Sequence, residues 1–106
     1  MKLVINGYNL RGNPVGIANV AINFLNSLKD SNDIQIILLV TPFINESIMN
    51  RIDKKKNLTI KALQQKNAII WILYTLKKEI NRLKPDYLWS PSPLLPYGIK
   101  KNIKKL

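Results

Sequence analysis

The sequence of 106 residues contains no cysteine, no histidine and only six acidic residues. The absence of cysteine excludes disulfide bonds and thiol chemistry, so the cytoplasm is the expected compartment. The absence of histidine excludes a Ser-His-Asp triad and histidine-based acid–base catalysis within this chain, and no catalytic residue is assigned. No two of the carboxylates stand at metal-ligand spacing, so the sequence predicts no metal site, and it indicates no cofactor.

Long apolar segments are also missing. The longest apolar runs, residues 36–40 and 68–74, are far shorter than the ~20 residues that a membrane-spanning helix needs. The chain opens with Met-Lys and a short apolar strand, a pattern that lacks the apolar core and cleavage site of a secretion signal. We therefore expect a cytoplasmic protein without a membrane span.

Basic residues, by contrast, are abundant. Lys and Arg together number 17, and the net charge is +11. Such a charge favours an anionic partner, either nucleic acid or a membrane surface. Fourteen of these residues are lysines, whereas arginine, the usual residue for bidentate phosphate and base recognition, occurs only at Arg11, Arg51 and Arg82. Nucleic acid is therefore disfavoured, and peripheral association with the inner face of an anionic membrane stays open.

Strand-like and helix-like apolar patterns alternate along the chain, which indicates one α/β domain over residues 1–106. The expected strands are 2–6, 34–40, 58–63 and 86–90, with a further element beginning near 103. The expected helices are 17–28, 45–51 and 68–83, the last capped by Asn67 and stopped by Lys84-Pro85.

Two helices show an apolar stripe at helical spacing. The first stripe comprises Ile17, Val20, Ala21, Phe24, Leu25 and Leu28. The second comprises Ile69, Leu73, Leu76, Ile80 and Leu83, widened by Trp71 and Tyr74, which are both expected to pack in the core.

Helices that alternate with buried strands predict a Rossmann-like parallel sheet with flanking helices. The expected strand order is 3-2-1-4. This order places the loops after the first and fourth strands, residues 7–16 and 90–98, side by side at the carboxyl edge of the sheet. Ligands of open α/β sheets bind at this switch point, so we expect the two loops to face each other across a crevice.

The first loop is rich in glycine but lacks a complete phosphate-binding motif. Gly7 and Gly12 have the spacing of the first half of GxxxxGK[ST], but Asn13 and Pro14 stand where the lysine and hydroxyl residue should be. Gly16 at the helix start would let backbone N–H groups approach an anion, with Arg11 adding a charge. The alternative is that the glycines only permit turns. In the second loop, the hydroxyls of Ser90, Ser92 and Tyr97 would face the crevice, unless this loop is only a rigid connection.

Three stretches carry a resemblance to a known family. The first is residues 1–28, with Val15-Gly16-Ile17 at the end of its loop, and the second is residues 71–83 followed by Lys84-Pro85-Asp86-Tyr87-Leu88. The third is residues 89–96 (Trp-Ser-Pro-Ser-Pro-Leu-Leu-Pro). The chain resembles the N-terminal domain of GT-B glycosyltransferases, specifically the retaining family 4, also called group 1. The resemblance implies half of a GT-B fold and transfer of a sugar from a nucleotide-sugar to a lipid-linked or polysaccharide acceptor.

The resemblance also implies roles for particular residues. Gly16, with Arg11, would contact the donor diphosphate, and Ser90, Ser92 and Tyr97 would line the acceptor side. The His-Asp pair common in this family and its C-terminal donor domain are not part of these 106 residues. We therefore expect no turnover by this chain alone, and a nucleotide-sugar partner only together with a donor domain. The alternatives are a small basic module that binds an anionic surface and an inert fragment.

Overall fold

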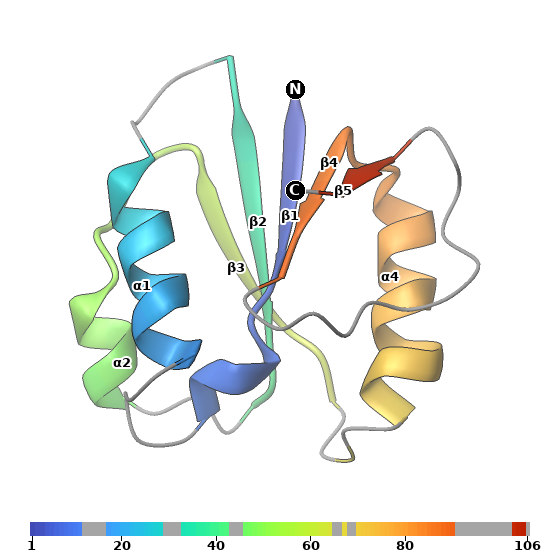
Figure 1. Ribbon diagram of the computed structural model, residues 1–106, viewed down its shortest axis with the longest axis horizontal. Helices are drawn as coiled ribbons and strands as arrows, with labels where there is room; N and C mark the ends of the chain where they lie inside the picture. Colours follow the sequence, from blue (N-terminus) through green and yellow to red (C-terminus); the bar gives the residue numbers. More distant parts are fainter. Residues whose placement is uncertain are drawn as a thin grey trace.

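The computed structural model describes residues 1–11, 17–28, 33–42, 46–64, 67, 70–90 and 103–105. Within them, all strands form one parallel sheet in the order β3-β2-β1-β4-β5 (Figure 1). The strands are β1 (Lys2–Asn6), β2 (Gln35–Val40), β3 (Leu58–Ala62), β4 (Tyr87–Trp89) and β5 (Lys104–Lys105). The α/β class, the Rossmann-like sheet and the strand order 3-2-1-4 that the sequence predicts are confirmed, and β5 is the further element expected near residue 103.

Helical elements cover both faces of the sheet. They are η1 (Tyr8–Arg11, a 3-10 turn), α1 (Ile17–Ser27), α2 (Glu46–Arg51), η2 (Trp71–Thr75, a π turn) and α4 (Leu76–Leu83). Figure 1 shows α1 and α2 on one side of the sheet and α4 on the other. None of the helices in the described part of the chain is long and apolar enough to cross a membrane.

Strand alternation divides the apolar residues between two cores. Leu3 and Ile5 of β1 pack with α1 and α2, whereas Val4 points to the opposite face and packs with α4. Strand β2 divides in the same way, with Leu38 on the first side and Leu39 on the second. Since both faces are covered, the central strands are apolar on both sides, as in other parallel sheets.

The buried face of α1 is rotated from the predicted stripe. Ala18, Ala21, Ile22 and Leu25 are buried, whereas Val20 is 53% exposed. At about 100° per residue, Val20 lies nearly opposite the centre of the buried face. The prediction for Val20 is therefore wrong, because apolar residues occur around most of this helix and their spacing alone does not select one face.

The predicted helix 68–83 contains a π turn, and this turn changes which residues are buried. The backbone N–H of Leu76 donates to the carbonyl of Trp71, five residues earlier, so that both residues point to the sheet. In an uninterrupted α-helix the two would diverge by about 140°. Trp71 and Leu76 are fully buried, but Tyr74 is 68% exposed, and the expectation that Tyr74 packs in the core is wrong.

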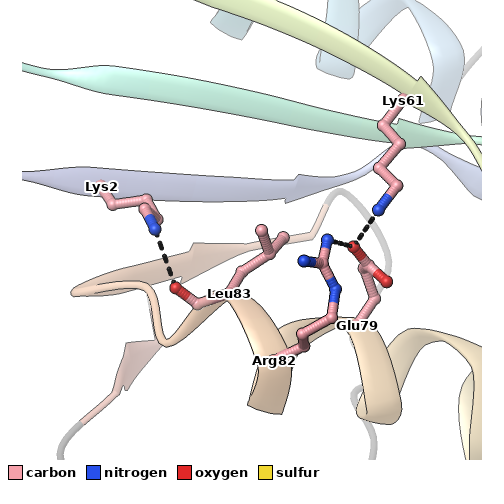
Figure 2. Close-up of polar contacts among 5 residues, drawn as sticks. All are labelled: Lys2, Lys61, Glu79, Arg82 and Leu83. Carbon is pink, nitrogen blue, oxygen red and sulfur yellow. Dashed lines mark hydrogen bonds and ion pairs between the residues drawn. The ribbon is translucent and has the colours of Figure 1, made fainter.

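Both ends of this helical segment have partners. The side chain of Asn67 accepts a hydrogen bond from the backbone N–H of Ile70 at 3.1 Å, which confirms the predicted cap. At the other end, Lys84 adopts a left-handed conformation with φ 50°. The Nζ of Lys2 donates to the carbonyl of Leu83 at 2.9 Å (Figure 2). A cation at this position also interacts favourably with the helix dipole.

Candidate functional site

The carboxyl ends of β1 and β4 lie side by side, as the strand order requires. Ile5 pairs with Trp89 at the end of the shared ladder, so Asn6 and Ser90 are the next residues along the two strands. The Nδ2 of Asn6 donates to the Oγ of Ser90 at 3.3 Å. The end of β1 and the start of the second loop are therefore in direct contact at the switch point, where open α/β sheets bind ligands.

Asn6 is the polar centre of this edge. Its side chain points to the α4 side of the sheet, like that of Val4, and the residue is only 2% exposed. Its Oδ1 accepts two hydrogen bonds, one from the indole Nε1 of Trp71 at 3.0 Å and one from the backbone N–H of Tyr8 at 3.2 Å. One buried amide thus connects the end of β1, the start of η1, the π turn and the end of β4.

Two aromatic rings complete the centre. The rings of Tyr8 and Trp71 lie 5.3 Å apart at 48°, and both residues are buried. The sequence indicates an aromatic core role for Trp71, and the structure adds a polar one. The indole N–H has a partner because the π turn places Trp71 over the end of β1. A buried indole N–H without a partner would cost about 1–3 kcal/mol.

Gly7 has a structural role at this edge. Its N–H donates to the carbonyl of Leu39 at 2.7 Å, and a Cβ at this position would lie only 2.6 Å from the same oxygen. Any side chain would push β1 and β2 apart at their ends. Close packing against β2 is therefore enough to explain why glycine is required at position 7, without a role in phosphate binding.

The sequence-predicted site residues are only partly described. Gly16, Ser92 and Tyr97 lie outside the described residues. Arg11 is the last residue of η1, which follows directly from β1 at the carboxyl edge. Ser90 lies at this edge as expected, half-buried and bonded to Asn6. The roles proposed for these residues toward a donor or an acceptor stay predictions.

Sequence reasoning missed Asn6, Tyr8 and the polar role of Trp71. One signal pointed to Asn6: it is a polar residue directly after three apolar strand residues, at the carboxyl end of the first strand. No pattern in the sequence linked it to Trp71, because the two are separated by 65 positions and a π turn has no periodic signature.

Glu79 is a carboxylate with a lowered pKa, and it pairs with Lys61 at the carboxyl end of the outer strand β3, two strands from Asn6. Glu79 of α4 is 9% exposed, and its Oε1 accepts from both Lys61 of β3, at 2.5 Å, and Arg82 (Figure 2). The hydrogen bond from Arg82 is the main cause that lowers the pKa of Glu79; burial opposes this effect and Lys61 reinforces it. This cluster fastens α4 to β3. Nowhere in the described residues do three or more acidic side chains gather as metal ligands would.

The Asn6–Trp71 hydrogen bond predicts a coupled effect on stability. Asn6→Ala leaves the indole N–H unpaired and should destabilise the chain by about 1–3 kcal/mol. In a Trp71→Phe background the same change should cost less, because the indole N–H is already gone. A double-mutant cycle in urea should give a coupling of roughly 1 kcal/mol.

Asn26 offers a matched control for this cycle. It also makes two side-chain hydrogen bonds, with the carbonyl of Arg51 and the N–H of Asp53, but on the opposite side of the sheet. Asn26→Ala and Trp71→Phe should therefore be additive. A zero coupling between Asn6 and Trp71, equal to that of the control, would contradict the assigned hydrogen bond.

The Glu79 cluster predicts a pH dependence. Because folding lowers the pKa of Glu79 below 4.5, its ionised form stabilises the fold above that pH, and the contribution is lost as pH falls through the lowered value. Glu79→Gln should cost on the order of 1 kcal/mol at neutral pH. In urea unfolding measured from pH 7 downwards, the difference in unfolding free energy between Glu79→Gln and wild type should become smaller in acid.

Two arginine variants separate the cause. Arg82→Gln removes the main partner of Glu79 and should move the loss of stability to higher pH. Arg51→Gln removes an equal charge from α2, where the guanidinium of Arg51 donates to Asn19 and not to Glu79. This variant should leave the pH dependence of stability unchanged. If the difference in unfolding free energy between Glu79→Gln and wild type stays constant down to pH 3, the lowered pKa of Glu79 is refuted.

Comparison with known proteins gives no further guide to this site. The chain matches no protein-family model, no curated protein and no solved structure. A function must therefore be argued from the fold, the carboxyl edge and the sequence resemblance.

Proposed function

We propose that this chain is the acceptor-side domain of a two-domain glycosyltransferase that moves a sugar from a nucleotide-sugar to a lipid-linked or polysaccharide acceptor. The observation that carries the proposal is the contact between Asn6 and Ser90, which joins the end of β1 to the start of the second loop at the switch point of a parallel sheet. Ligands of such sheets bind outside the carboxyl ends of the strands. The sequence stretches that resemble family 4 enzymes include the loop that begins at Ser90.

In this proposal the domain forms one wall of a cleft. Helix α1 begins at Ile17, and its first turn contains no acidic residue. No carboxylate of this first turn would therefore compete with a diphosphate for the N–H groups and the dipole at the helix N-terminus near Gly16. Arg11 is nearby in sequence. Ser90, Ser92 and Tyr97 would offer hydroxyl groups to the acceptor on the other side.

The chemistry of transfer would need the second domain. Glu79, the buried carboxylate of the described chain, forms ion pairs with Lys61 of the outer strand β3 and with Arg82 of α4. Its role is therefore structural. The donor domain would bring the groups that hold the nucleotide and the leaving diphosphate. By itself, this domain would bind donor weakly and would not turn over.

A titration with nucleotide-sugars tests the proposal. UDP-glucose and GDP-mannose, added separately to the isotopically labelled chain, should shift backbone amide signals of Asn6, Gly7, Tyr8 and Ser90. The affinity should be no tighter than about 1 mM, which corresponds to roughly −4 kcal/mol. Glucose, mannose and inorganic phosphate serve as controls.

Two results would count against a shared cleft. Shifts confined to other parts of the chain, or reproduced in full by phosphate alone, would remove the reason to assign this edge to a nucleotide-sugar. Micromolar binding by the chain alone would show a complete donor site and would contradict the need for a second domain.

A further inference from the structure

The outward side of the η2–α4 segment carries a surface that neither the fold nor the carboxyl edge explains. Tyr74 is 68% exposed and Ile70, at the start of the same segment, is 40% exposed. Tyr74, Lys77, Lys78 and Asn81 line a hollow of about 320 Å³. We call these four residues and Ile70 the α4 outer surface.

The π turn accounts for the exposed aromatic ring. It points Trp71 and Leu76 to the sheet, and Tyr74, between them, points to solvent. A single exposed apolar residue is ordinary on a protein surface. Here, however, the exposed ring of Tyr74 lines a hollow together with two lysines, and Ile70, four positions earlier in the chain, is exposed as well.

The net charge of this segment is positive. Residues 70–84 contain four basic residues (Lys77, Lys78, Arg82 and Lys84) and one acidic residue, Glu79, which gives +4 − 1 = +3. Glu79 is turned inward and paired with Lys61 and Arg82. No carboxylate of this helical segment therefore offsets Lys77 and Lys78 on the outside.

We propose that the α4 outer surface docks on an anionic lipid membrane. Tyr74 and Ile70 would enter the interfacial region, where amphipathic aromatic rings are favoured, while Lys77 and Lys78 contact lipid phosphates. Lipid fits better than nucleic acid because the cations that line the hollow are lysines, Lys78 exposed and Lys77 half-buried. An aliphatic side chain such as Ile70 also gains from lipid but does not stack on bases. The proposal stands independently of sugar transfer.

Vesicle co-sedimentation tests the docking. The chain should bind vesicles of phosphatidylcholine mixed with phosphatidylglycerol at low salt, bind them less at high salt, and ignore pure phosphatidylcholine. Lys77→Glu with Lys78→Glu should reduce binding at least about tenfold, because each lysine close to an anionic surface contributes roughly fivefold.

The matched control reverses the same two charges elsewhere. Lys54 and Lys56 are exposed in the stretch before β3, next to Lys55, which bonds the carbonyl of Leu25 at the end of α1 on the opposite side of the sheet. Lys54→Glu with Lys56→Glu should weaken binding less than about threefold, since only the long-range attraction changes. Equal losses in the two double variants would overturn the proposal, because the attraction would then be diffuse.

A second measurement locates the contact without relying on charge reversal. Tyr74→Trp should bind as wild type, and brominated lipids should quench its added fluorescence, whereas they should not quench the buried Trp71 and half-buried Trp89 of the wild-type chain. Unquenched fluorescence in a vesicle-bound chain would refute docking through this surface. Tighter binding to a single-stranded oligonucleotide than to the anionic vesicles would assign the surface to nucleic acid instead and equally overturn the proposal.

Discussion

The hydrogen bond between the indole N–H of Trp71 and the side chain of Asn6 is the interaction on which the carboxyl edge depends. It is buried, and it joins the end of the central strand to the helical segment on the α4 side. The same amide also accepts from the N–H of Tyr8 and donates to Ser90. Because Asn6, Tyr8 and Trp71 are buried, losing one of these partners leaves another polar group unpaired, which costs more than the bond itself contributes.

The π turn gives this bond its geometry and determines the helix's outer side as well. By adding one residue to a turn, it aligns Trp71 with Leu76 and leaves Tyr74 outside. π turns are frequent at functional sites. In this chain one local irregularity shapes both the proposed sugar-transfer cleft and the proposed membrane-docking surface, on two different sides of the molecule.

The strand order of the sheet could be predicted from the sequence, but the sequence did not show which side of each helix packs on the sheet. Strand order follows from short apolar runs separated by helical patterns. The apolar arc of α1 is wider than the face that packs on the sheet, so the pattern wrongly predicted that Val20 is buried. The π turn left no periodic signal in the sequence, so the pattern also wrongly predicted that Tyr74 is buried. Of the candidate site, Ser90 was found by its place after a strand, whereas Asn6 gained its role only through a tertiary contact with Trp71.

Exchange of the Trp71 indole proton with solvent tests this account most directly. Since this N–H is buried and bonded to Asn6, it should be protected as strongly as the backbone amides of β1 and far more than the indole proton of the half-buried Trp89. Comparable protection of the Trp71 indole and the β1 amides would support Asn6 as the organising residue. Exchange of the Trp71 indole as fast as that of Trp89 would contradict it.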